Sequence, residues 1–498
     1  MAKTVYHQRM VLLSSVLLIC SSVTLSVGCG SSKMSQASLE RTDQGVLHLS
    51  PALINLPQGN TARFEPIQNA TAISPSSCAW QANDPTVLLS KGNGEFIGAG
   101  VGSSYVTAIC HGSITSASVL VSSVSNPSAI KITSGGTYSG NWSSTDPTVP
   151  AVTILTNEPV VLRNSTLSGR GDLIVVYGSQ NGANVTIDNV TGTALDPGIA
   201  GAARGKFLGA EVVSSLSVTH CTMHGVSFGV YVSSSKMTSL TIRDNVADNL
   251  DDRESDGHGS YLSNQRVLGH YIQLAGVSLS NGGEIAWNQV INSEGIASIE
   301  DILNFYLSRG TGKNPLVVHD NYLQGAFSTG QTTTYTGGGI QMDGGSNDRS
   351  MATGFIQVSH NTVVHTAGYG ISIAAGHDIA MTENRIVSCG KDSSGNWITI
   401  PLSTALVMMN YYQSNQFFNN YMANNSGGVV RPDANGNPIP GDISAPGASV
   451  SLNNIVGTNV FEQPCLIGSG LTLAAESAEK LRWLNSVSSA GESLGDQH

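Results

Sequence analysis

The feature that most constrains the fold is a loose internal repeat between about residues 164 and 454. In each unit, a polar residue closes one apolar, strand-like stretch and then recurs one unit later. The recurring positions are Asn164, Asn189, His220, Asn245, Asn288, Asn321, Asn361, Asn384, Asn420 and Asn454. The shortest step, from Asn361 to Asn384, is 23 residues. A period of this length, built from short β-rich units, predicts a parallel β-solenoid.

Spacing within the units supports this interpretation. Ile174, Val230 and Ile371 each lie ten residues after a recurring residue, and each begins an alternating apolar strand. We expect the recurring Asn side chains to stack inside the bends as hydrogen-bond ladders that satisfy buried backbone groups. A solenoid of this kind has no cleft of its own, so function is expected in loop insertions and along one strand face.

Composition excludes several classes of protein. Charged residues make up only 11% of the chain and hydrophobic residues 40%, which argues against intrinsic disorder. The net charge is −11 and no run rich in Lys or Arg occurs. Nucleic-acid binding is therefore not expected. The same charge gives no attraction to an anionic substrate unless a cation intervenes.

The N-terminus has the pattern of an export signal. Two basic residues precede an apolar stretch over residues 11–27, and Gly28-Cys29 follows. This junction resembles a bacterial lipobox, so we predict a lipoprotein signal peptide over 1–28, a lipid on Cys29 and a flexible tether over 29–46. The alternative is an ordinary signal peptide with an incidental Cys. Either interpretation predicts export, and a lipid would hold the protein at the bacterial cell envelope, on the outer membrane in a Gram-negative host.

The remaining cysteines divide into two groups. Cys78 and Cys110 bracket one predicted β-domain, and in an oxidising compartment we expect them to form a disulfide. Cys221, Cys389 and Cys465 are left over, and we expect them to be buried apolar fillers.

A separate β-domain is predicted over residues 47–125. Its motifs are Cys78-Ala79-Trp80, a Gly-rich turn leading into a strand over 98–108, and a closing alternating strand over 117–121. These motifs resemble those of bacterial immunoglobulin-like domains. The resemblance implies either a carbohydrate- or wall-binding module or a spacer, and we favour the spacer because fold alone does not give function.

From Ile130 the pattern changes. Ile130-Lys131-Ile132 and the Gly-rich stretch 135–140 begin a region that continues through Gly229-Val230-Tyr231-Val232 and Gly370-Ile371-Ser372-Ile373. It resembles the right-handed parallel β-helices of the pectate lyase superfamily. We therefore expect an all-β protein whose β-helix occupies residues 126–466. Residues 467–498 are expected to form a C-terminal helix and tail, with a helix over 473–487 capping the open end of the solenoid.

Four repeat units are enlarged on the same turn, the one that precedes the Val230-type strand. Three of these insertions span 251–270, 294–301 and 326–338, and the fourth lies between Asn384 and Leu406. We expect the loops to stack into one wall beside the outward face of that strand. In the superfamily this face and its loops form the saccharide cleft. The candidate substrate-binding residues are Tyr231, Gln273, Gln341, Asp343 and His365.

Acidic residues concentrate in the same loops, and five are candidate catalytic residues. These are Asp251, Asp252, Glu294, Glu300 and Asp301. Asp251 and Glu294 both lie six residues after a recurring Asn, so we expect them to stack one strand spacing apart, roughly 5 Å. Asp301 is expected to face solvent, at a position where other units carry Gly. The alternative is that these acids only cap turns, and that His365 is a ladder residue.

Two chemistries fit such a wall. In a hydrolase, one carboxylic acid protonates the glycosidic oxygen and a second activates water or attacks the sugar. In a lyase, calcium held by Asp251, Asp252 and Glu294 would neutralise a uronate, with Arg309 or Lys313 as base. We favour the hydrolase because the wall contains more acids than bases. The rival class is a non-catalytic carbohydrate-binding surface protein or adhesin.

The family's catalytic residues do not transfer to this chain. Gly257-His258-Gly259 is similar to a polygalacturonase motif, but its companion residues do not occur at the usual separations. The expected partners are a polysaccharide and, through the lipid, a membrane. We expect a monomer.

Overall fold

The computed structural model describes residues 47–50, 53–68, 71–122, 129–179, 181–327, 336–399, 403–446, 453–468 and 470–496. The predicted signal peptide, the Cys29 lipidation site and the tether lie outside these residues. The described chain is all-β, with 51% strand and 5% helix, as predicted. Among the described residues, no helix combines the length and the apolar character needed to cross a membrane.

Residues 47–122 form a small β-domain with its own hydrophobic core. Its four-stranded sheet has the order β2 (Leu53–Pro57), β10 (Ser113–Ser122), β9 (Gly102–Cys110) and β6 (Cys78–Ala82). Two three-stranded sheets complete it: β1 (Leu47–Ser50), β4 (Glu65–Gln68) and β5 (Thr71–Ala72), and β3 (Thr61–Arg63), β8 (Glu95–Gly98) and β7 (Leu88–Gly92). A 3-10 turn, η1 (Pro75–Ser77), precedes β6. Phe64 and Phe96 pack edge to face in the core.

The predicted disulfide between Cys78 and Cys110 is confirmed. The two residues lie directly opposite each other on β6 and β9, so the bond joins neighbouring strands of one sheet.

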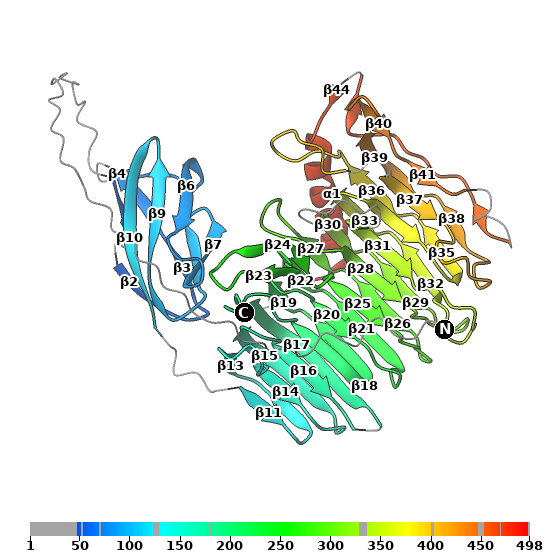
Figure 1. Ribbon diagram of the computed structural model, residues 1–498, viewed down its shortest axis with the longest axis horizontal. Helices are drawn as coiled ribbons and strands as arrows, with labels where there is room; N and C mark the ends of the chain where they lie inside the picture. The colour runs from blue at the N-terminus through cyan, green and yellow to red at the C-terminus, as the bar shows by residue number, and fades with distance from the viewer. Residues whose placement is uncertain are drawn as a thin grey trace, which may run out of the picture. The chain divides into compact units, whose positions relative to one another are not determined.

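The rest of the chain is dominated by one sheet of 30 strands, β11 to β22 and β25 to β42, most of them paired in parallel (Figure 1). From β25 onward most strands pair in parallel with the strand three further along the chain, so three strands make one turn of the chain. This arrangement is compatible with the predicted solenoid. It contains three strand stacks, which we call the first, second and third stacks in the order in which the chain visits them.

The first stack contains β11 (Ile130–Ile132), β14 (Val152–Ile154), β16 (Ile174–Tyr177), the start of β18 (Leu208–Thr219), β20 (Val230–Val232), β25 (Ile272–Ala275), β28 (Asp301–Tyr306), β31 (Gly338–Asp343), β34 (Tyr369–Ile373), β37 (Thr404–Met408) and β41 (Ile443–Ser444). The second contains β12 (Gly136–Tyr138), the starts of β15 (Val160–Gly169) and β17 (Ala183–Ala194), the end of β18, β21 (Ser239–Arg243), β26 (Gly283–Ala286), β29 (Leu316–His319), β32 (Gly354–Ser359), β35 (His377–Thr382), β38 (Tyr421–Ala423) and β42 (Ile455–Val456). The third contains β13 (Asn141–Ser144), the ends of β15 and β17, β19 (Thr222–His224), β22 (Val246–Asp248), β27 (Gln289–Ile291), β30 (Tyr322–Ala326), β33 (Thr362–Thr366), β36 (Arg385–Ser388) and β39 (Ser426–Pro432). Outside the stacks lie a hairpin of β23 (Arg253–Ser255) and β24 (Tyr261–Arg266), the strand β40 (Pro438–Pro440) beside β39, and a second hairpin of β43 (Leu466–Ile467) and β44 (Gly470–Leu471).

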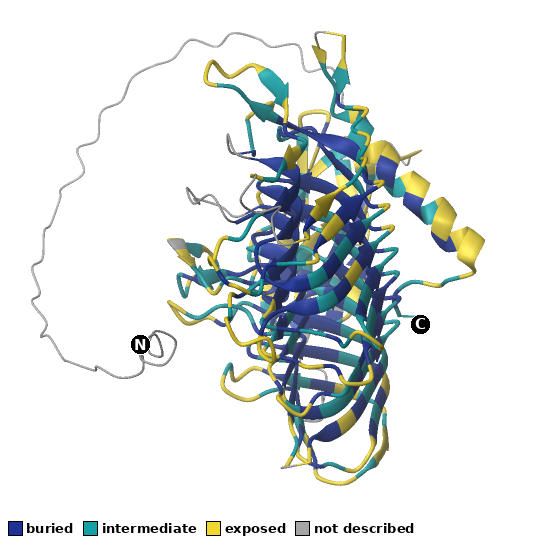
Figure 2. Ribbon diagram, turned by 90° about the vertical axis from the view of Figure 1, so that its right-hand side faces the viewer, coloured by how far each residue is buried: buried dark blue, intermediate teal, exposed yellow. Residues whose placement is uncertain are grey.

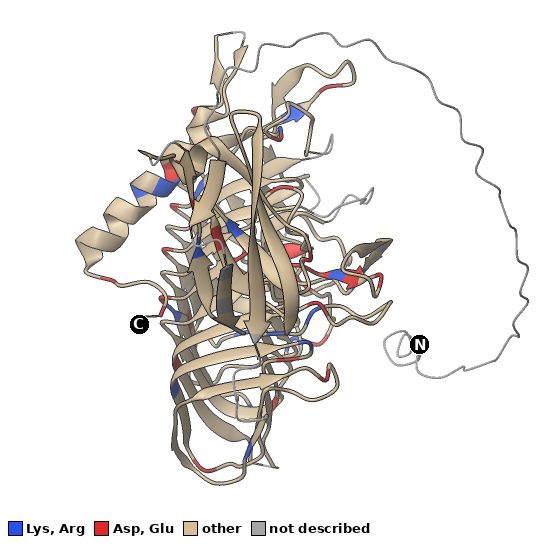
Figure 3. Ribbon diagram, turned by 90° about the vertical axis from the view of Figure 1, so that its left-hand side faces the viewer, with Lys and Arg blue, Asp and Glu red and all other residues tan. Residues whose placement is uncertain are grey.

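Inward residues of the three stacks form one continuous core, which gives the strands their buried colour in Figure 2. In the first stack, Ile272, Leu303, Ile340 and Ile371 lie in direct register and are fully buried. Because successive side chains alternate between the two faces of a strand, the residue after each of these points outward. Most of the ribbon carries no charged residue (Figure 3), which agrees with a core that extends along the whole stack.

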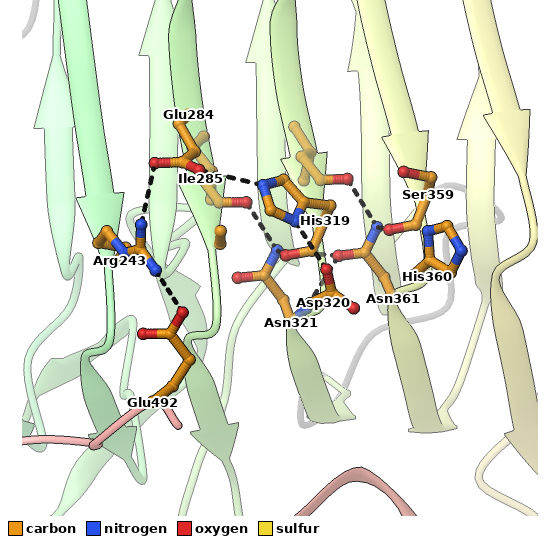
Figure 4. A network of polar contacts seen from close by, with 12 residues as sticks. Arg243, Glu284, Ile285, His319, Asp320, Asn321, Ser359, His360, Asn361 and Glu492 are labelled. Carbon is orange, nitrogen blue, oxygen red and sulfur yellow. Dashed lines mark hydrogen bonds and ion pairs between the residues drawn. The ribbon is translucent and has the colours of Figure 1, made fainter. Parts of the chain in front are cut away.

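The predicted asparagine ladder exists, with a shifted membership. Asn245, Asn288, Asn321, Asn361 and Asn384 are fully buried, and the side-chain amide of each donates to the next Asn at 2.8–3.0 Å. Figure 4 shows one step of this ladder, from Asn321 to Asn361. Beyond Asn384 the ladder continues through Asn425 and Asn459. Asn420 and Asn454, which were predicted to belong to it, instead cap the turn between the first and second stacks, where Ile379 N donates to Asn420 Oδ1.

The first three predicted positions are displaced by one residue. Asn164, Asn189 and His220 have positive φ angles of 47°, 56° and 50°, the left-handed conformation that Asp244 adopts just before Asn245. The predicted side-chain bond between Asn164 and Asn189 does form, since Asn189 Nδ2 donates to Asn164 Oδ1 at 2.8 Å, but at the surface rather than in the core. The ladder position in the His220 unit is therefore Cys221, whose backbone N–H donates to Asn245 Oδ1. Cys221 is buried and unpaired, as predicted.

The prediction that Cys389 and Cys465 are unpaired fillers is wrong, because they form a second disulfide. Their sequence separation of 76 left no local signal for this pairing. They meet because the segment after β42 returns to the end of β36, where both cysteines are buried.

The only helix in the described residues, α1 (Ala474–Ala490), does not cap the open end as predicted. It packs instead along the third stack, against β33 and β36, with its exposed side turned outward (Figure 2). Trp483 packs against Tyr322 with the two rings tilted by 35°, and its Nε1 donates to Asp320 O. The tail then continues along the stack, where Glu492 pairs with Arg243 (Figure 4). This side of the strand stacks therefore provides an apolar contact for Trp483 of α1 and a cation for Glu492 of the tail.

Candidate functional site

The four enlarged segments all join the third stack to the first, and residues 328–335 and 400–402 within them lie outside the described residues. They connect β22 to β25, β27 to β28, β30 to β31 and β36 to β37. Beside them, the outward residues of the first stack form a row in direct register, which we call the outward row. It consists of Tyr231, Gln273, Asn304, Gln341 and Ser372. The sequence did not reveal Asn304, because the spacing of the repeat predicted that Ile302, rather than Leu303, lies in register with Ile340.

A pocket of about 250 Å³ opens at the middle of this row. We call it the acidic pocket; its lining residues are Glu300, Asp301, Gln341, Asp343, Tyr369, Ala374, Tyr411 and Tyr412. Four of them, Glu300, Asp301, Gln341 and Asp343, are among the residues predicted from sequence. The two acids at the start of β28 face Asp343 at the end of β31, and the connection from β37 to β38 supplies the tyrosine pair.

Asp301 is buried, with 2% of its surface exposed, so the expectation that it faces solvent is wrong. Its Oδ1 accepts hydrogen bonds from Tyr369 Oη at 2.8 Å and Gly338 N at 3.1 Å, and its Oδ2 accepts one from Asn304 Nδ2 at 3.3 Å. Gly338, in register with Asp301, leaves the space in which the Tyr369 ring reaches Asp301, because a Cβ at this position would lie 2.1 Å from that ring. Burial and the neighbouring Glu300 raise the pKa of Asp301 well above its ordinary value.

Glu300 is a carboxyl group that can hold a proton near neutral pH. Burial raises its pKa to about 7; Arg266 opposes this shift, and Asp343 and Asp252 reinforce it. His270 Nε2 lies 3.5 Å from Glu300 Oε2. Burial lowers the pKa of His270 to about 4, so this imidazole is uncharged at neutral pH.

Asp252 lies next to this pair and is fully buried. Gly269 N donates to its Oδ2 at 3.1 Å, and the Ser298 hydroxyl interacts with this carboxyl group and lowers its pKa. Burial raises the pKa of Asp252 to about 6, against the opposing charge of Arg266. The Arg266 guanidinium thus acts on both Asp252 and Glu300, and its two terminal nitrogens also lack hydrogen-bond partners in the described part of the chain.

Asp251 and Glu294 do not stack as predicted. Asp251 lies opposite Ser298 and forms hydrogen bonds with Arg253 Nε at 2.7 Å and Nη2 at 2.9 Å. Asp251 pairs with Ser298 instead of Glu294 because residues 293–297 form a turn, in which Ala297 N donates to Ser293 O. Glu294 is left at the flank of the third stack, where its Oε2 accepts a hydrogen bond from Ser393 Oγ.

His365 also belongs to the flank rather than to the outward row. Its Nε2 lies 2.8 Å from Glu294 Oε1 and its Nδ1 lies 3.0 Å from Glu476 Oε2 on α1. Burial lowers the pKa of His365, but the two carboxylates outweigh burial, and the pKa lies above its ordinary value.

The residues proposed for a calcium-dependent lyase are not assembled. Asp251 pairs with arginine and Glu294 with His365, and neither lines the acidic pocket. No group of three or more His, Cys, Asp or Glu side chains in the described ranges is arranged to hold a metal ion. Arg309 packs over the Phe355 ring, and neither it nor Lys313 lines the pocket.

Sequence reasoning missed the tyrosines of the pocket. Tyr412 donates from its hydroxyl to Asp343 Oδ1 at 2.6 Å, and Tyr411 and Tyr412 remain 55% and 47% exposed. They lie in the connection that follows the first stack, whereas the sequence-based prediction placed the site on the loops that precede this stack. The adjacent pair Tyr411-Tyr412, at the end of an apolar strand, was the available signal.

A comparison with protein-family models found no match for this chain, and neither did a comparison with curated proteins. The fold and the site define the class at this level: an all-β protein with a large, mostly parallel sheet and an acidic pocket rimmed by tyrosines on its first stack. A protonatable carboxyl group beside further carboxylates can carry out acid–base chemistry.

Proposed function

We propose that this protein is an exported polysaccharide-active enzyme of the glycoside hydrolase type. The observation that carries the proposal is the acidic pocket: Glu300, with its raised pKa, shares one small cavity with Asp343 and Asp301. Perturbed carboxyl groups gathered in a pocket are a recurrent mark of catalytic sites. Long loops beside a rigid strand stack are a suitable setting for them.

In the proposed mechanism, Glu300 is the proton donor to the glycosidic oxygen. Asp343, which accepts a hydrogen bond from Tyr412, is the second carboxylate that activates water or attacks the sugar. This reassigns Asp343, which sequence analysis placed among the substrate-binding residues. Asp301, Asp252 and Arg266 are positioning residues that set the charge around Glu300. Saccharide would extend along the outward row, over Gln273 and Tyr231 on one side and Ser372 on the other.

The finer family assignment is part of the same proposal. The three-strand turns, the asparagine ladder and the loops on one turn support a right-handed parallel β-helix of the pectate lyase superfamily. The small N-terminal domain, with its disulfide and its buried Phe pair, supports the immunoglobulin-like interpretation.

Export and lipid anchoring are proposed from the N-terminal pattern. Two disulfides, one in each folded part, suit a protein that matures in an oxidising compartment. Metabolic labelling with a fatty-acid analogue tests the anchor: the wild type should be labelled and Cys29→Ala should not. Equal labelling of both proteins would contradict it.

A non-catalytic binder is the second candidate, favoured by one observation: Tyr411 and Tyr412 are exposed beside the pocket and could stack on sugar rings. An assay of the wild type on a polysaccharide panel separates the candidates. The proposed hydrolase releases reducing ends without unsaturated products, a lyase releases ultraviolet-absorbing unsaturated ends, and a binder retains polysaccharide and releases neither. Either of the last two results would contradict the proposal.

A further inference from the structure

Three oxygens of the outward row, one of them on the pocket residue Gln341, have no hydrogen-bond partner in the described residues. Asn304 Oδ1, Gln341 Oε1 and Ser372 Oγ are consecutive in the outward row, each belongs to a residue at least nine-tenths buried, and none has a hydrogen-bond partner in the described residues. For Asn304 the orientation is fixed, because its Nδ2 donates to Asp301. Buried acceptors of this kind are costly unless a ligand donates to them.

The charges around the pocket are also one-sided. Glu300, Asp301 and Asp343 line it, and Asp252 is close enough to raise the pKa of Glu300. The described lining residues include no Lys, Arg or His. The neighbouring cation, Arg266, already faces two of these four carboxyl groups.

From these two observations we infer that the pocket accepts a sugar unit rich in hydrogen-bond donors and free of carboxylate, either a hydroxyl-bearing neutral sugar or an amine-bearing sugar. The inference rests on the proposed function, because it names the substrate class of the same site. Hydroxyl and ammonium groups donate to carboxylate and amide oxygens. A uronate would add its own carboxylate to this group of acids, which raises like-charge repulsion, and that carboxylate would give no donor to the Asn304 and Gln341 oxygens.

Tyr411 and Tyr412 are consistent with this class. Their rings offer an apolar surface at the rim of the pocket, on which the C–H face of a sugar can pack while its hydroxyl or amino groups point toward the acceptors. The tyrosine rings do not by themselves distinguish charged from uncharged sugars. The carboxyl groups and the outward row are therefore the groups that would discriminate between sugar classes.

The test measures binding to matched polymers of glucose, glucosamine and glucuronic acid, each in several linkages. It uses both the wild type and the Glu300→Gln variant, so that binding is followed with and without turnover. At least one neutral or amine-bearing polymer should bind, and the corresponding uronate polymer should bind at least about tenfold more weakly. Comparing the glucose and glucosamine arms shows which donor the pocket prefers.

Two variants sharpen the test. Asp343→Asn removes one formal negative charge from the pocket. It should therefore narrow the difference in binding affinity between neutral and uronate polymers. Asp433→Asn makes the same change in an exposed turn outside the pocket and should leave that difference unchanged.

The outcomes separate the two claims. Uronate polymers that bind as well as or better than the neutral and amine-bearing ones would overturn this inference and leave the proposed hydrolase in place. Binding and turnover of none of the polymers would overturn the proposed function and the inference together.

Discussion

Two groups of acids, each with one glutamate in the loop between β27 and β28, have opposite surroundings. In the flank cluster, formed by Glu294, His365 and Glu476 together with the Arg385–Glu479 pair, the carboxylates are matched by donors. Glu479 is 2% exposed and accepts hydrogen bonds from Arg385 Nε at 2.7 Å and Nη2 at 2.8 Å. In the acidic pocket, the one ion-pair contact of the Glu300 side chain within the described residues is with a neutral His270, at 3.5 Å.

The difference shows that the number of acids in a loop does not identify a site. Glu294 and Glu300 lie six residues apart in one loop, yet one is matched by His365 and Ser393 and the other is held among further acids. The matched acids fasten α1 to the third stack. The unmatched ones retain the capacity to exchange a proton, which is the property that catalysis requires.

The largest expected effect comes from exchanging the two glutamates of this loop. Glu300→Gln should lower turnover of an active polysaccharide by about a hundredfold or more, because it removes the proposed proton donor. Glu294→Gln, the matched control, should keep turnover within a few-fold. Steady-state rates of both variants, with melting temperatures to show that each is folded, test the comparison. Equal activity of the two variants would remove the distinction between the regions.

The next effect is on stability and lies in the flank cluster. Glu479→Gln breaks a buried ion pair and leaves Arg385 without its main partner, which should cost about 3 kcal/mol of unfolding free energy. Turnover should be unaffected at temperatures where the variant is folded. Denaturant unfolding measures the loss, and a variant as stable as the wild type would show that α1 is not fastened through this pair.

Asp301→Asn should lower the free energy of unfolding by an intermediate amount. The asparagine Nδ2 would replace Oδ2 and face the Nδ2 of Asn304, so one hydrogen bond is lost and two donors oppose each other. We expect a cost of about 2 kcal/mol. Thermal unfolding beside a Glu211→Gln control at an exposed position, which should change stability by less than about 0.5 kcal/mol, checks this. A cost as small as that of the control would contradict the buried position of Asp301.

The smallest effect is the pH dependence of the flank. The pKa of His365 is raised above its unfolded value of about 6.5 by Glu476 and Glu294, against burial. The stabilisation is therefore fully present below about pH 6.5 and is lost as pH rises through the raised pKa. His365→Gln should flatten this loss, by about 1 kcal/mol, in unfolding experiments across that window. An unchanged pH dependence in the variant would exclude His365 as its source.

Sequence reasoning recovered the features that periodicity encodes. The solenoid-like stack, the ladder from Asn245 to Asn384, the turn that carries the long loops and four residues of the acidic pocket all follow from spacing. The Cys78–Cys110 disulfide followed from proximity in one small domain. Each of these depends on contacts that repeat, or that lie within a short stretch of chain.

The errors arose where one residue of register or a distant contact decides the outcome. A one-residue shift hid Asn304 and made Asp301 seem exposed, and the turn at 293–297 separated Glu294 from Asp251. The Cys389–Cys465 bond and the position of α1 depend on packing between segments far apart in the sequence. Tyr411 and Tyr412 were missed because they approach the pocket from the opposite turn.

The most direct test of the central claim is the pH dependence of turnover. Glu300 has a folded pKa of about 7, above its ordinary 4.5, so it is protonated over a wider range than an exposed glutamate. As a proton donor it should give kcat/KM values that fall tenfold per pH unit above about pH 7. Glu294→Gln should show the same fall, and Asp252→Asn should move it to lower pH, because Asp252 helps to raise the pKa of Glu300. A profile that stays flat from about pH 6 to about pH 9 in the wild type would contradict the assignment of Glu300 and of the acidic pocket as the active site.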